Sequence, residues 1–206
     1  MKRVPCALIL LSAVLTVLVL PSAALAADIT HFRGKTASVE FYSLDPATCI
    51  TTSVTVFATE SRTRNLQEPP ANSASANVTV HQFNSCTWEN LVCASGSFDL
   101  PDGAFDIDNN LTAASVTATA ELYDICSGTN RSIDLAVTLA GAGELLRTNT
   151  RYSSQYPGYR VVYRHRGQSR DATAAGSLIV DGTPLPLENG NGYLTNATSG
   201  TITIDR

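Results

Sequence analysis

The 206-residue sequence lacks the motifs by which most enzyme and metal-site classes are identified. It contains no Cys-x-x-Cys pair, no Gly-x-Ser-x-Gly, no His-Glu-x-x-His and no P-loop motif, and its three histidines are scattered. These absences argue against a zinc site, a serine hydrolase of the α/β type, a zincin protease and a P-loop nucleotide site. We therefore expect no catalytic residue, no metal and no cofactor. A glycosidase needs only two suitably spaced carboxylates, so an extracellular hydrolase acting on polysaccharide is the alternative function.

Long apolar runs are absent after residue 26, where nothing approaches the ~20 residues that span a bilayer. The one apolar run, 7–20, follows Lys2 and Arg3 and precedes the small residues of Ala24-Leu25-Ala26. A basic start, an apolar stretch and a small-residue site make up a signal peptide. We expect cleavage after Ala26, which leaves residues 27–206 as a single secreted, extracellular domain with no membrane segment.

Helical periodicity is also absent beyond residue 26, whereas period-two alternation is common. Ile133, Leu135, Val137 and Leu139, for example, alternate with mostly polar neighbours, as in a strand with one buried and one wet face. The pattern predicts an all-β fold, an antiparallel β-sandwich or barrel of roughly 9–12 short strands with two disulfides. The expected strands are 36–43, 50–59, 76–83, 91–100, 116–123, 132–139, 159–166, 178–181 and 201–204.

Four cysteines follow the expected cleavage point: Cys49, Cys86, Cys93 and Cys126. An even number of cysteines in an exported chain indicates disulfides. Cys49 precedes one expected strand, Cys86 follows the next, and a hairpin centred on residues 67–68 places them side by side. We therefore prefer Cys49–Cys86 and Cys93–Cys126. The rival pairing is Cys86–Cys93 with Cys49–Cys126.

Residues 147–170 form the most distinctive segment, with six arginines, four tyrosines and no acidic residue. On a strand from Tyr159, alternation turns the arginines to one face and the tyrosines to the other. Guanidinium groups suit carboxylate, sulfate or phosphate, and tyrosines suit sugar rings or bases. The candidate binding residues are Arg151, Tyr159, Arg160, Tyr163, Arg164 and Arg166.

The overall charge is mildly acidic, at −4 for the whole chain, and predicts no partner by itself. Its distribution is uneven, because residues 89–144 hold nine acidic residues and one basic residue. The basic segment therefore either pairs with these acids across the sheet, or drives head-to-tail association, or binds an anionic glycan or other extracellular polymer. We expect a non-catalytic binding or structural role, with no nucleic acid as the partner in vivo. The oligomeric state stays open.

Overall fold

The computed structural model describes residues 27–65 and 68–205. The expected signal peptide therefore lies outside the described residues. The described part of the chain contains strands joined by turns and short loops, and no helix. No helix long and apolar enough to cross a membrane occurs within it.

Nine strands occur in the described residues, and every pair of neighbouring strands is antiparallel. The order in the sheet is β4-β3-β2-β1-β9-β8-β7-β6-β5, and β4 also pairs with β6. The sheet therefore closes on itself. Of the two architectures that the sequence predicts, sandwich or barrel, this is the barrel. The strands are β1 (Ala27–Asp45), β2 (Ile50–Asn65), β3 (Ala71–Asn84), β4 (Glu89–Asp99), β5 (Phe105–Ile107), β6 (Ala113–Asp124), β7 (Thr129–Tyr156), β8 (Tyr159–Val180) and β9 (Thr183–Asp205).

The all-β, antiparallel prediction is confirmed, but several strands are longer than expected. The expected strands 159–166 and 178–181 are the two ends of the single strand β8, and β7 continues 17 residues beyond 139. Apolar alternation marks only those parts of a strand that have one buried face. In β8 the intervening residues 167–177 are small or polar, and the two that are buried in the core are alanines, Ala172 and Ala174, so the apolar alternation fades although the strand continues.

The core lies inside the closed part of the sheet. Val54, Val56 and Ala58 of β2 are buried there, in one cluster with the expected inward residues of β7, Ile133, Leu135, Val137 and Leu139. The segment 105–113 crosses one end of this core and buries Leu111 completely. A Cβ on Gly141 would lie 2.0 Å from the carbonyl oxygen of Leu111, so only glycine permits this close approach.

Both preferred disulfides are present. Cys49–Cys86 joins the β1–β2 turn to the β3–β4 turn, and Cys93–Cys126 joins β4 to the residues after β6. In the β2–β3 hairpin Ile50 pairs with Asn84, and Cys49 and Cys86 lie just beyond this pair, as the sequence predicts.

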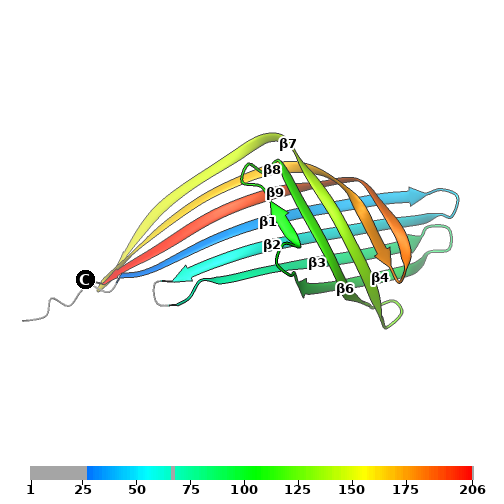
Figure 1. Ribbon diagram of the computed structural model, residues 1–206, viewed down its shortest axis with the longest axis horizontal. Helices are drawn as coiled ribbons and strands as arrows, with labels where there is room; N and C mark the ends of the chain where they lie inside the picture. The colour runs from blue at the N-terminus through cyan, green and yellow to red at the C-terminus, as the bar shows by residue number, and fades with distance from the viewer. Residues whose placement is uncertain (1–26, 66–67, 206) are drawn as a thin grey trace, which may run out of the picture.

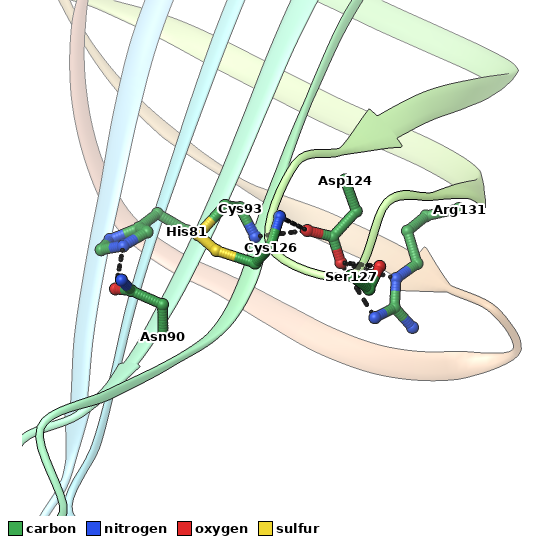
Figure 2. Close-up of a disulfide and its surroundings, with 7 residues drawn as sticks. All are labelled: His81, Asn90, Cys93, Asp124, Cys126, Ser127 and Arg131. Carbon is green, nitrogen blue, oxygen red and sulfur yellow. Dashed lines mark hydrogen bonds and ion pairs between the residues drawn. A yellow bond between two sulfur atoms is a disulfide. The ribbon is translucent and has the colours of Figure 1, made fainter.

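The closure between β4 and β6 is short, with Ala94 opposite Asp124 and Ser95 opposite Tyr123. The Cys93–Cys126 bridge and the buried carboxylate of Asp124 reinforce it (Figure 2). Oδ1 of Asp124 accepts hydrogen bonds from the backbone N–H of Cys93 at 3.1 Å and of Cys126 at 3.0 Å. Oδ2 accepts from Ser127 Oγ at 2.9 Å and from Arg131 Nε at 3.0 Å.

Ionisation of Asp124 is favoured by this environment. Burial opposes the charged form, but the hydrogen bonds from Cys93, Arg131, Ser127 and Cys126 outweigh it and lower the pKa of Asp124 to about 2. Arg131 also forms an ion pair with Asp181 at 3.0 Å. One carboxylate therefore ties β4, the β6–β7 turn and, through Arg131, the β8–β9 turn together.

Several strands continue far beyond the closed part, as Figure 1 shows. We call this extension the arm and define it as residues 27–35, 60–65, 71–74, 146–156, 159–170 and 195–205. Its strand order is β3-β2-β1-β9-β8-β7. Ala27 lies opposite Ile204, so both ends of the described chain lie at the tip of the arm.

Candidate functional site: the basic face of the arm

The register of β8 and β9 decides which way the arm arginines point. Residues directly opposite each other in an antiparallel pair share a face. Arg170 lies opposite Leu194, which is fully buried in the core, so Arg170 points to the inner face of the sheet. Every second residue along β8 from Arg170 towards Tyr159 therefore also points to the inner face, and so do the residues of β7 that lie opposite them. All six arginines of segment 147–170 therefore lie on the inner face.

Strands β1 and β2 add four further basic residues to this face. Lys35 lies opposite Asn196 and Arg33 lies opposite Thr198, both on the inner side of β9. Arg62 is opposite Arg33, and Arg64 is two residues further along β2. The sequence analysis missed these four residues. Their signal was the spacing of two between Arg33 and Lys35 and between Arg62 and Arg64, which puts each pair on one side of a strand.

Ten of the twelve Lys and Arg residues after residue 26 thus share one surface, which we call the basic face. Of the other two, Arg131 is ion-paired and Arg206 lies outside the described residues. The basic face consists of Arg33, Lys35, Arg62, Arg64, Arg147, Arg151, Arg160, Arg164, Arg166 and Arg170.

The basic face has two charged flanks and an uncharged centre. On one flank Arg151 lies opposite Arg164, and on the other Arg33 lies opposite Arg62. The central strand β9 presents small or neutral residues between them, Gly200 among them. Adjacent strands are ~4.8 Å apart and alternate residues ~6.6 Å apart along a strand. The guanidinium groups therefore line both sides of a shallow track along β9.

A hollow of about 340 Å³ lies where this track meets the closed part of the sheet. Arg166 and Arg33 stand on its two sides with Thr198 between them. Arg33 Nη2 donates to Asn109 Oδ1 at 2.8 Å, which fixes that guanidinium against the 105–113 segment. The lining residues are Arg33, Asn109, Arg166, Gln168, Asn196 and Thr198. Every one of these side chains can donate a hydrogen bond to an anion.

No member of the basic face forms an ion pair within residues 27–65 and 68–205, although the Glu60 carboxylate lies opposite Lys35 on the same face. The ion pairs in that range are those of Arg131 with Asp124 and Asp181. Four members of the basic face do make hydrogen bonds, but to neutral oxygens: Arg33 to Asn109, Lys35 to Ile107, Arg160 to Ser153 and Arg170 to Gly143. The first of the three alternatives, pairing of segment 147–170 with the acids of 89–144, is not seen as an ion pair among the described residues. Most of these acids lie in β4, β5, β6 and the turns around them, whereas the arginines lie on β7 and β8.

The outer face of the arm has a different chemistry. Tyr152 stacks on Tyr163 with ring centroids 4.8 Å apart, and Tyr156 stacks on Tyr159 at 4.9 Å. Each pair is directly opposite in the β7–β8 register, and the neighbouring outer positions are largely threonine and serine. The six candidate residues are therefore divided by the sheet. Arg151, Arg160, Arg164 and Arg166 lie on the basic face, whereas Tyr159 and Tyr163 lie on the opposite side.

Such an arrangement can hold several anionic groups at once. A guanidinium group presents fixed, planar N–H donors that match the geometry of carboxylate, sulfate and phosphate. Like charges gathered on one surface repel each other and produce a positive field that attracts anions. The basic face is thus suited to a ligand with repeated negative charges.

Comparisons with known proteins add no functional assignment. No protein-family model matches the sequence, and no curated protein is similar enough to count as a relative. Among solved structures, a putative AttH from Nitrosomonas europaea has 12% identity and a TM-score of 0.31, covering 86% of this chain. The chain spans 52% of that protein's length. An acetoacetate decarboxylase-like enzyme from Sphingomonas wittichii RW1 has 12% identity and a TM-score of 0.22, over 88% of this chain and 92% of its own. At these TM-scores, neither likeness carries a conclusion about this chain.

Proposed function

We propose that the protein is a secreted, disulfide-stabilised β-domain that binds an acidic extracellular glycan along the basic face of the arm. One observation carries the proposal: ten basic side chains share one surface and none of them has an acidic partner within ion-pair distance in the described residues. A single exposed charge contact contributes little, ~0.2–1 kcal/mol. A polymer that touches many of them at once gains useful affinity.

The separation of charges and rings argues against a nucleic acid, and it leaves charge contacts rather than ring stacking as the basis of glycan binding. Proteins that bind single-stranded nucleic acid combine a basic groove with aromatic side chains on which the bases stack. The exposed tyrosines of the arm lie on the face opposite the arginines. Within the arm, Glu60 is the one carboxylate on the inner face among the described side chains, which favours binding over glycoside hydrolysis, since hydrolysis usually needs two.

The proposed extracellular location rests on the signal-peptide pattern of residues 1–26, in which charged, apolar and small residues follow in order. The two disulfides are compatible with an extracellular protein. We expect the exported protein to begin at Ala27 and to contain no free thiol. Intact mass spectrometry before and after thiol alkylation measures both. A mass that includes residues 1–26, or alkylation without prior reduction, would contradict the proposal.

The glycan-binding proposal predicts a large effect of removing three exposed arginines. In the triple variant Arg151→Gln, Arg164→Gln and Arg166→Gln, affinity for a sulfated or uronate-rich polysaccharide should fall about tenfold to a hundredfold. The parent's affinity should itself decline steeply with salt, and the variant's should decline less steeply. Fluorescence anisotropy with a labelled oligosaccharide across a salt series measures both quantities.

A matched control separates the basic face from net charge. Thr63→Glu, Thr148→Glu and Thr150→Glu together change the net charge by the same three units, but these exposed threonines lie on the outer face. This variant should bind nearly as tightly as the parent. An equal loss of affinity in both variants would show that net charge alone causes the effect. An unchanged affinity in the arginine variant would show that the binding site lies elsewhere. Tighter binding of single-stranded DNA than of a glycan of equal charge density would favour a nucleic acid instead.

A further inference from the structure

The closed sheet is split between β1 and β9 at the end opposite the arm. The two strands pair as far as Glu40 and Asn191. Beyond that point β1 continues to Asp45 beside β2, and the first residues of β9 pair with β8 alone. β9 turns away at Asn189, which has a φ of 55°. A Cβ on the next residue, Gly190, would lie 2.5 Å from the Phe41 ring.

A cavity of about 520 Å³ occupies this split. Its apolar wall is formed by Phe41, Ile50, Val54, Leu185 and Leu187. This volume falls within the usual range for small-molecule sites, ~300–1,000 Å³. An apolar wall of this kind suits a hydrocarbon or aromatic body.

Two polar side chains converge in the same cavity. Gln82 Nε2 donates to Thr52 Oγ1 at 3.2 Å, and both are partly buried. They leave hydrogen-bonding capacity for a ligand, because Gln82 retains its carbonyl oxygen and one amide hydrogen. A largely apolar cavity with a few placed polar groups is the usual composition of a small-molecule site.

The charge at the mouth of the cavity is negative. Asp45 and Glu188 both line it, and none of the lining residues is basic. Asp45 is fixed by Thr48 Oγ1 at 2.8 Å and by the backbone N–H of Ala47 at 2.9 Å. These hydrogen bonds, that from Thr48 foremost, lower the pKa of Asp45, so its carboxylate is charged at neutral pH. An anionic ligand would be repelled here, in contrast to the arm.

We propose that the split between β1 and β9 binds a small amphipathic molecule whose apolar body lies against Phe41, Val54 and Leu187 and whose ammonium group lies between Asp45 and Glu188. This site is independent of the basic face, since the two lie at opposite ends of β1. The protein then has one surface for a polyanion and a separate cavity for an amphipathic cation.

Competition between two chain-matched amphiphiles tests the proposal. The uncharged fluorophore N-phenyl-1-naphthylamine should bind the purified mature protein and gain fluorescence. Dodecylamine, below its micellar concentration and at low salt, should displace it at a concentration at least about tenfold lower than dodecanoate does. Equal displacement by the two would refute the role of Asp45 and Glu188. Absence of fluorophore binding would refute the cavity as a ligand site.

Three variants locate the site. Leu185→Trp fills the cavity wall and should weaken fluorophore binding at least about tenfold. Leu44→Trp adds the same side chain to an exposed outer position of β1 and should leave binding unchanged. Glu188→Gln replaces an exposed residue without disturbing the fold and should reduce the preference for the amine about threefold. Parent-like fluorophore binding by a folded Leu185→Trp variant, or an unchanged amine preference in Glu188→Gln, would overturn the assignment.

Discussion

Replacing Cys93 and Cys126 together by serine is expected to lower the free energy of unfolding by about 4 kcal/mol. The two residues are 33 positions apart, and a cross-link over a loop of this size removes much conformational entropy from the unfolded chain. Loss of the bridge should also weaken the closure of the native sheet. β4 and β6 share only two opposed residue pairs, so without the bridge this seam should open readily.

The other disulfide provides the control. Cys49 and Cys86 are 37 positions apart, so their removal should cost a similar amount of unfolded-state entropy. Their strands, however, are held by the long β1–β2 and β2–β3 registers. Urea unfolding measures the two losses, and amide hydrogen exchange of β4 and β6 measures the opening. Full exchange protection of these strands in the Cys93→Ser, Cys126→Ser variant would show that hydrogen bonding alone closes the sheet.

The closed part of the fold could be read from the sequence because its strands have one wet and one buried face. The inward set of β7, from Ile133 to Leu139, alternates with outward residues, and the alternation identifies both the strand and its face. The arm was predictable only in part: the expected strands 159–166 and 201–204 lie within it, where the buried Val162 is opposite Ile202 on the inner face. The rest of the arm carries mainly arginine and asparagine on one side and threonine and tyrosine on the other, without a long apolar stripe.

The disulfide pairs were predictable because hairpin geometry is local. Two residues equidistant from a turn become neighbours in an antiparallel pair, and Cys49 and Cys86 are equidistant from the loop at residues 67–68. The sequence alone did not decide between this pairing and its rival, because both are compatible with β-structure. The observed β2–β3 register is what makes the preferred pair adjacent.

Six of the ten basic-face residues lie in segment 147–170, and they were predictable for a similar reason. Arg151 and Arg164 belong to one hairpin, β7–β8, whose basic composition stands out in the sequence. Arg33 and Arg62 join them only because the C-terminal strand β9 pairs with the N-terminal strand β1. No local pattern shows that pairing, since it follows from closure of the whole sheet.

Replacing the buried Asp124 by asparagine is expected to lower the free energy of unfolding at neutral pH by about 3 kcal/mol. The Asp124 carboxylate accepts hydrogen bonds from Cys93, Cys126, Ser127 and Arg131, two on each oxygen. An asparagine amide, in either orientation, turns an NH₂ group towards two donors. It also removes the charge that pairs with Arg131 at 2.9 Å.

Asp181→Asn is the matched control for this substitution. Asp181 contacts the same guanidinium, through Arg131 Nη1 at 3.0 Å, but its side chain is 41% exposed. Water can replace the interactions that an exposed side chain loses on substitution, so Asp181→Asn should lower the free energy of unfolding clearly less than Asp124→Asn does. Equal losses in urea unfolding would mean that Arg131, rather than the buried position of Asp124, determines the effect.

The pH dependence of the Asp124→Asn effect follows from the direction of the pKa shift. Hydrogen bonding lowers the pKa of Asp124 to about 2 in the folded state, below its ordinary value of 3.8. A carboxyl with a lowered folded pKa stabilises the fold fully above its unfolded pKa, and this contribution is lost as the pH falls towards the folded pKa. Here it amounts to about 2 kcal/mol at neutral pH. The stability gap between the parent and Asp124→Asn should therefore be constant from pH 7 to about 5 and narrow by that amount between pH 5 and 2. A gap that stays constant down to pH 2 would show that Asp124 is not held as a carboxylate in the closed sheet.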